Sequence, residues 1–182
     1  LYLSNPNPRV GCVIVKNGQV IGRGFTQKVG SAHAEVQALA DAKALGHDPA
    51  GSTVYVTLEP CNHTGRTPPC VDALIAAKPA VVFIAMSDPN PLVAGKGLER
   101  LKAAGITVHC GLMESEARAL NPGFISRMTR GLPWVRMKIA ASLEELAAAI
   151  EAMPAAGKKS FPAGNGKPVA ARTRRSKKET NA

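Results

Sequence analysis

The chain has 182 residues, a length that suits one domain with an appendage. With 45% hydrophobic and 20% charged residues, it holds enough apolar side chains for a core, which excludes a wholly disordered chain. No apolar run approaches the roughly 20 residues of a membrane helix, and no basic-then-apolar leader is present. We therefore expect a cytoplasmic protein, and because the chain starts at Leu1 we expect a fragment of a longer one.

The net charge of +10 is concentrated at the carboxyl end. Residues 157–182 hold eight Lys or Arg and one acidic residue, and the rest of the chain carries a net charge of only +3. This segment is rich in Gly and Pro and poor in large apolar residues, which predicts a disordered basic tail. The four cysteines are too few for a disulfide scaffold in a chain of this length, so a metal or catalytic role is favoured for any clustered pair.

Hydrophobic patterning predicts alternating strands and helices. After a turn-rich opening segment, β-branched runs predict strands at 10–15 and 20–25, joined by an Asn-Gly turn. Helical spacing then predicts a helix from His33 to Leu45. The later predicted elements are strand 53–58, a helix at 70–75, strand 81–86, a short helix at 98–101, strand 106–110, one helix at 114–128, strand 134–140 and helix 142–153.

A starting hairpin followed by alternating strands and helices indicates a mixed sheet covered by helices on both faces. The predicted fold class is therefore α/β, a three-layer α/β/α sandwich with a mixed central sheet. We predict three regions: a folded domain over 1–141, a short helical extension over 142–156 and the basic tail over 157–182.

Three residues at strand-to-helix junctions predict a metal site. His33 opens a predicted helix, Cys61 follows a strand, and Cys70 opens the next helix after Pro68-Pro69. Two thiolates and one imidazole suit Zn²⁺ and leave a fourth tetrahedral position for water, which is typical of a catalytic site. His63 is close in sequence and can in principle compete for that fourth place.

Glu35 lies two residues after His33, in the first turn of the predicted helix. At that position both side chains can border the space beyond the helix end, which would hold a carboxylate beside the metal without making it a ligand. A general acid/base there can move a proton from water to a leaving amine. His-x-Glu followed by Pro-Cys-x-x-Cys is typical of zinc deaminases of nucleobases, but here the second cysteine comes nine residues after the first.

The segment TLEPCNHTGRTPPC at 57–70 resembles the zinc motif of the riboflavin-biosynthesis pyrimidine deaminases, the deaminase half of bifunctional deaminase/reductase enzymes. The segments PNPRVGC at 6–12, HAEV at 33–36 and DPNP at 88–91 are similar to that family in the same order. The resemblance covers roughly residues 1–142.

This resemblance implies a cytidine-deaminase-like fold, Zn²⁺ held by His33, Cys61 and Cys70, and Glu35 as the proton shuttle. The implied reaction is hydrolytic deamination of 2,5-diamino-6-ribosylamino-4(3H)-pyrimidinone 5′-phosphate, with release of ammonia. It further implies that the substrate, a small pyrimidine ribotide, is bound by Asn7, His63, Arg66, Asp88 and Asn90. Family members tend to self-associate, so a homo-oligomer is expected.

The sequence also departs from the family pattern. Thr26 stands where the family commonly has a histidine, and the helix that should precede the Asn-Pro motif is missing except for its exit. No dinucleotide-binding or reductase region follows Ser142, so we expect no reductase activity.

Two other functions remain open. A deaminase of a base in tRNA or single-stranded DNA would use the basic tail, but it needs stacking aromatic residues, and the chain has only seven. An inactive zinc-binding fragment of the bifunctional enzyme is the other, because strand 134–140 has no evident partner.

Overall fold

The computed structural model describes residues 4, 6–64, 68–91 and 93–135, together with 142, 144, 147, 148 and 151. The chain divides into two compact units, Leu1–Arg136 and Met137–Ala182. The fold below is that of the first unit. Most of the predicted strand 134–140, most of the extension 142–156 and the whole basic tail lie outside the described residues.

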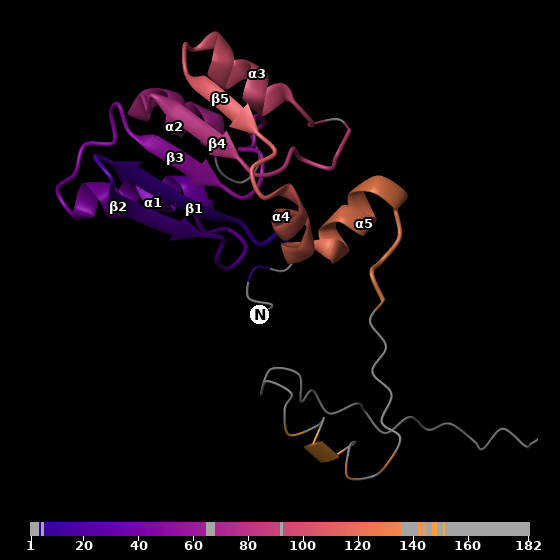
Figure 1. Ribbon diagram of the computed structural model, residues 1–182. Helices are drawn as coiled ribbons and strands as arrows, with labels where there is room; N and C mark the ends of the chain where they lie inside the picture. The colour runs from indigo at the N-terminus through magenta and orange to yellow at the C-terminus, as the bar shows by residue number, and fades with distance from the viewer. Residues whose placement is uncertain are drawn as a thin grey trace, which may run out of the picture. The chain divides into compact units, whose positions relative to one another are not determined.

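A five-stranded mixed sheet forms the centre of the first unit, in the order β2-β1-β3-β4-β5 (Figure 1). Strand β1 (Gly11–Lys16) pairs antiparallel with both β2 (Gln19–Phe25) and β3 (Thr53–Val56). Strands β3, β4 (Val81–Ile84) and β5 (Thr107–Cys110) are parallel. The predicted hairpin is confirmed: Asn17 and Gly18 both have positive φ, as a tight hairpin turn requires.

Three helices connect the strands and pack on one face of the sheet. They are α1 (Ala34–Ala44), α2 (Cys70–Ala77) and α3 (Lys96–Ala103). Alternate residues of the central strands, such as Ile14, Val54 and Val82, form the main core with Leu74 of α2 and Leu101 of α3. On the opposite face the rings of Tyr55, Phe83 and His109 stack on one another across β3, β4 and β5. The predicted α/β sandwich with a mixed sheet is confirmed, and among the described residues the three connecting helices cover one of its faces, whereas helices were predicted on both.

Two glycines of β2 allow α1 to lie directly against the sheet. A Cβ at Gly24 would collide with the backbone oxygen of Ala34 and lie 2.5 Å from the nitrogen of Ala38. A Cβ at Gly22 would collide with the oxygen of Ala38 in the same way. Any larger residue would push the start of α1 away from the sheet, so these glycines determine where His33 and Glu35 are held.

The segment predicted as one helix over 114–128 is two helices, α4 (Glu114–Leu120) and α5 (Pro122–Arg130). Asn121 separates them with φ −132°, because Pro122 has no N–H to continue α4 and instead begins α5. The prediction of a single helix was wrong at this junction. Both helices lie beyond one end of the strands (Figure 1). Ala117, Phe124 and Ile125 pack there with Leu58 and Met86 in a second, smaller apolar cluster.

No helix in the part of the chain that the structure covers is both long and apolar enough to cross a lipid bilayer. The carboxyl ends of the parallel strands β3 and β4 and the amino ends of α1 and α2 meet at one edge of the sheet (Figure 1). Open α/β sheets commonly bind ligands at such an edge.

Candidate metal centre and active-site pocket

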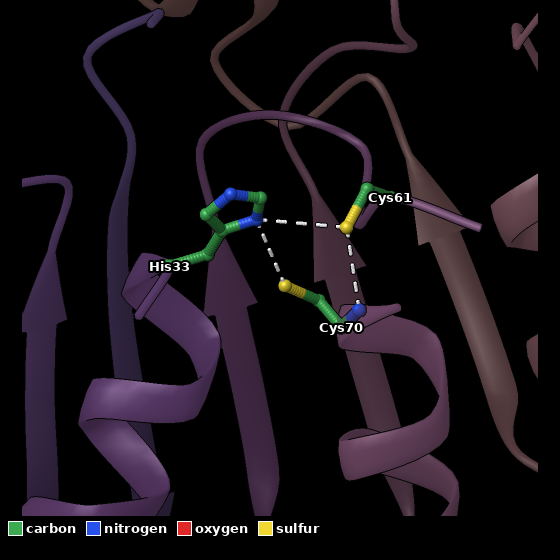
Figure 2. Close-up of side chains that lie close together, drawn as sticks. All are labelled: His33, Cys61 and Cys70. Carbon is green, nitrogen blue, oxygen red and sulfur yellow. Dashed lines mark hydrogen bonds between the residues drawn. The ribbon is translucent and has the colours of Figure 1, made fainter. Parts of the chain in front are cut away.

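Three side chains from separate segments converge at this edge of the sheet (Figure 2). His33 is the residue before α1 and has extended backbone, Cys61 lies in the loop after β3, and Cys70 is the first residue of α2. Their potential ligand atoms all lie within 4.8 Å of one another. The Nδ1 atom of His33 is 3.5 Å from the sulfur of Cys61 and 3.2 Å from that of Cys70. The structure thus brings together the three residues predicted to bind a metal.

The pKa values of the two cysteine thiols are shifted in opposite directions. The backbone N–H of Cys70 donates to the sulfur of Cys61 at 3.3 Å. Hydrogen bonding by Cys70 and by His33 lowers the pKa of the Cys61 thiol to about 4, and the same contact with Cys61 raises the pKa of Cys70. Hydrogen bonding to Cys61 also raises the pKa of His33. The cluster therefore already favours one thiolate, which is the form that binds a metal.

This donor set fits Zn²⁺. All four cysteines of the chain are free thiols, so Cys61 and Cys70 are available as ligands. Two sulfurs and an imidazole nitrogen are ligands that Zn²⁺ prefers, and three protein ligands are the number found in catalytic zinc sites. His63 is not part of the converging group, although it borders the neighbouring cavity. Within the residues that the structure describes, no carboxylate joins the three ligand atoms.

Glu35 lies beside this cluster in the first turn of α1. Its side chain is buried, with 4% of its surface exposed, and it borders the same cavity as His33 and Cys61. Burial raises the pKa of Glu35 to about 6. The sequence predicts that Glu35 and His33 both face the space beyond the helix end, and the cavity lining agrees with that placement.

A cavity of about 520 Å³ opens next to the cluster. Besides Glu35, His33 and Cys61, it is bordered by four of the residues predicted to bind substrate: Asn7, His63, Asp88 and Asn90. Cys70 is buried and does not line the cavity. Arg66, the predicted phosphate contact, lies outside the described residues. Thr26, named above as a departure from the family pattern, also borders the cavity.

Asp88 is half-buried in the wall of the cavity. Its carboxylate accepts a hydrogen bond from the backbone N–H of Asn90 at 2.8 Å, which closes a tight turn and directs both residues to the same side. Desolvation is the main reason why the pKa of Asp88 is raised, and the charge of Glu59 adds to it. A carboxylate next to an amide gives this wall of the cavity both hydrogen-bond acceptors and donors.

Sequence reasoning missed several residues of this wall. Phe124 and Met128 of α5 close one side of the cavity with apolar surface, and Glu59 borders it from the end of β3. The amphipathic pattern of 122–130 indicates that α5 has an apolar face, but nothing local shows which surface that face meets.

Asn121 is a further residue that sequence reasoning missed. Its side chain accepts from the backbone N–H of Arg9 and donates to the carbonyl of the same residue, both at 2.7 Å. These two bonds connect the α4–α5 junction to the segment that carries Asn7. The Asn-Pro pair at 121–122 indicates a break in a helix, but no local pattern gives its distant partner.

Comparison with known proteins agrees with this geometry. Residues 2–86 match the family model of the cytidine and deoxycytidylate deaminase zinc-binding region. The riboflavin biosynthesis protein RibD of Escherichia coli is 57% identical over 143 residues, which cover 79% of this chain and 38% of that protein. The RibD structure from Acinetobacter baumannii is 54% identical with a TM-score of 0.72, and the match covers 79% of this chain and 40% of that one.

A third relative is a Thermotoga maritima structure described as a diaminohydroxyphosphoribosylaminopyrimidine deaminase/5-amino-6-(5-phosphoribosylamino)uracil reductase. It is 43% identical with a TM-score of 0.70, over 74% of this chain and 38% of that one. The chain thus spans about two fifths of the length of these relatives.

These matches, to the family model and to the RibD proteins, show that the chain belongs to the cytidine and deoxycytidylate deaminase family. Within that family the chain belongs with the deaminase domains of the RibD riboflavin biosynthesis proteins. The family resemblance and the cytidine-deaminase-like fold expected from the sequence are therefore confirmed.

Proposed function

We propose that this chain is a zinc-dependent deaminase of riboflavin biosynthesis. Its substrate would be 2,5-diamino-6-ribosylamino-4(3H)-pyrimidinone 5′-phosphate, and its products 5-amino-6-ribosylaminopyrimidinedione 5′-phosphate and ammonia. The observation that carries the proposal is the convergence of His33, Cys61 and Cys70 beside a cavity that Glu35 borders. The identity to RibD proteins supports the choice of substrate.

His33, Cys61 and Cys70 would hold the zinc ion. When bound at such a site, Zn²⁺ acts as a Lewis acid and lowers the pKa of a water molecule from 15.7 to about 7. The sulfur and nitrogen donors already lie within one coordination sphere of each other, so binding needs little rearrangement of the chain.

Glu35 would move the proton. In the reaction a C–O bond to water forms, the C–N bond to the amino group breaks, and the nitrogen leaves as ammonia after gaining a proton. Glu35 borders the cavity beside His33 and Cys61, a place from which it would reach both the attacking water and the leaving nitrogen of a bound ring. Its buried position keeps bulk water from competing for that proton.

The rest of the cavity would bind the ribotide. Asn7, Asp88 and Asn90 offer donors and acceptors for the ring and the ribose hydroxyls, and His63 stands at the same wall. Arg66 would pair with the 5′-phosphate, since a guanidinium matches phosphate geometry with two parallel hydrogen bonds. Phe124 supplies an apolar surface on the α5 side.

For this 182-residue chain we propose deamination without the reductase activity named for the Thermotoga maritima relative, because the match covers only 38% of that protein. Nucleic-acid bases are a less supported substrate. Phe124 is the only Phe, Tyr or Trp that borders the cavity among the described residues, whereas single-strand binding relies on several stacking rings.

Ammonia release from the diaminopyrimidinone ribotide by zinc-loaded protein tests the proposal. Glu35→Gln keeps the shape of the side chain but cannot take up a proton, so we expect kcat to fall by about 10²- to 10⁴-fold with zinc content unchanged. Glu99→Gln is the matched control, because Glu99 is exposed on α3 and does not border the cavity.

Three results would contradict parts of the proposal. Turnover by Glu35→Gln at the rate of the unaltered chain would show that Glu35 is not the proton shuttle. Absence of ammonia release by a chain that holds one zinc ion would show that the substrate or the activity is wrongly assigned. Oxidation of NADPH in the presence of the deaminated product would contradict the expected lack of reductase activity.

A further inference from the structure

Glu59 is a buried acidic residue that the proposed chemistry does not use. Only 4% of its surface is exposed, and it lies just after β3, two residues before Cys61. A carboxylate in such a place is costly unless its oxygens accept several hydrogen bonds. The contacts of Glu59 therefore indicate what the residue does.

Both carboxylate oxygens of Glu59 accept hydrogen bonds from backbone N–H groups of one distant segment, the connection from β4 to α3. The Oε2 atom accepts from the N–H of Asp88 and from the N–H of Gly95, each at 3.0 Å. The Oε1 atom accepts from the N–H of Gly97 at 2.9 Å. The backbone N–H of Glu59 also donates to the carbonyl of Met86 at 2.9 Å.

Through these hydrogen bonds, both ends of the β4–α3 connection are bound to the side chain of Glu59. Asp88 is near its start, whereas Gly95 and Gly97 are at its end and at the first turn of α3. Gly95, the residue before α3, makes no side-chain cap, so Glu59 satisfies N–H groups that the helix itself leaves open. Negative charge at the amino end of a helix is also favoured by the helix dipole.

A glycine at position 97 leaves room for this carboxylate. A Cβ at Gly97 would lie 2.5 Å from the carbonyl oxygen of Pro60 and 3.1 Å from Oε1 of Glu59. Gly97 therefore allows α3 to approach the segment 59–61 closely enough for the hydrogen bonds to form. The start of α3 is thus anchored to the segment that carries Cys61.

We propose that Glu59 is a positioning residue that holds the Asp88–Asn90 turn at the correct distance from the metal cluster. Asp88 and Asn90 both border the cavity. They belong to the β4–α3 connection, whose two ends are hydrogen-bonded to Glu59. The N–H of Asp88 bonds to Glu59, and the carboxylate of Asp88 in turn accepts from Asn90, so the restraint passes from one residue to the next. This inference rests on the proposed function for the identity of the substrate.

Glu59→Gln in the full, zinc-loaded chain tests the proposal. The amide retains the shape of the side chain, but its NH₂ group faces N–H donors, so at least one hydrogen bond is lost. We expect KM for the diaminopyrimidinone ribotide to rise about tenfold, the effect of losing one hydrogen bond to a charged group. We expect kcat to change by less than about threefold, because Glu35 and the metal ligands stay in place.

Amide hydrogen exchange gives a measurement that does not depend on activity. In Glu59→Gln the amides of Asp88, Gly95 and Gly97 should exchange at least about tenfold faster, while those of β1 and β3 should not change. Glu99→Gln, which removes the same charge from an exposed position on α3, should leave both KM and exchange unchanged. If Glu59→Gln does not fold, Glu59→Asp, which keeps the charge but is too short to reach all three donors, carries the same comparison.

Unchanged exchange at these amides in the variant would overturn the proposal. So would loss of zinc with faster exchange throughout the sheet, because that result would show a general structural role. If the unaltered chain releases no ammonia, the proposed function fails, and the exchange comparison still decides the role of Glu59.

Discussion

Gly24→Ala tests whether the close approach of α1 to β2 determines both the stability of the domain and the metal site. The added methyl group would collide with the backbone oxygen of Ala34 and lie 2.5 Å from the nitrogen of Ala38. Nonbonded carbon contacts are comfortable at about 3.5 to 4.0 Å, so α1 must move by about 1 Å. The atoms involved belong to the backbone, and no side-chain rotation relieves the contact.

The expected cost follows from this geometry. Overpacking a well-packed interior typically lowers the free energy of unfolding by about 1–3 kcal/mol. Because the atoms on one side of this contact belong to the rigid backbone, we expect a loss at the upper end of that range, about 3 kcal/mol. For a folded unit that spans Leu1–Arg136, such a loss corresponds to a fall in Tm of about 10 °C. Movement of α1 also displaces His33 relative to Cys61 and Cys70, so zinc affinity should fall as well.

Thermal unfolding followed by circular dichroism, together with zinc content after dialysis, measures both effects. Gly11→Ala is the matched control, because it is also a strand glycine but its nearest new neighbour is Cγ2 of Thr57 at 3.9 Å. We expect Gly11→Ala to melt within about 2 °C of the unaltered chain. The reasoning would be refuted if Gly24→Ala melted as the unaltered chain does, or if the two variants lost the same stability.

Three further predictions concern Cys61, Cys12 and the α4–α5 junction. Removal of the metal with a chelator should lower Tm and make Cys61 react with a thiol reagent, because its lowered pKa leaves it as a thiolate. Cys12 should stay unreactive until the chain unfolds, because it is 1% exposed and burial raises its pKa; alkylation of Cys12 in the folded chain, read by mass spectrometry, would contradict this. Asn121→Ala removes two hydrogen bonds of 2.7 Å and should destabilise the chain by about 1–3 kcal/mol in urea unfolding with zinc content unchanged. A variant that unfolds at the same urea concentration would show that these bonds contribute nothing to stability.

The metal cluster was predictable from sequence because its geometry follows from local rules. His33 and Cys70 stand at helix starts, and Cys61 follows a strand, so the topology alone brings the three to one edge of the sheet. Strands β1 and β3 were predictable from their β-branched runs, but these runs do not show which face of each strand is buried against the helices. Periodicity and turn-forming residues report on residues that are close in sequence. The starts of helices and the ends of strands depend mainly on such local residues, so they can be predicted.

The roles of Glu59 and Asn121 were not predictable in this way. Glu59 accepts from N–H groups 29 to 38 residues further along the chain, and the partner of Asn121 is 112 residues away. A side chain that satisfies distant backbone groups leaves no periodic pattern, and a glutamate within a zinc motif is naturally assigned to the chemistry of that motif. The prediction of a single helix over 114–128 was wrong for a related reason. In the sequence, Pro122 is compatible with either a kinked helix or the start of a new one, and the bond from Asn121 to the distant Arg9 leaves no local pattern.

The bonds between Asn121 and Arg9 also determine the order in which the parts of the site can arise during synthesis. All three proposed metal ligands have been added to the chain by Cys70, whereas the wall that contains Asn7 is secured only when Asn121 has emerged. Contacts of such wide sequence separation form late and slow folding, and chains fold from the amino end as they are made. We therefore expect the residues of the proposed metal site to be available before the pocket for a substrate is complete, and a metal bound at that stage would shield Cys61 and Cys70 from oxidation.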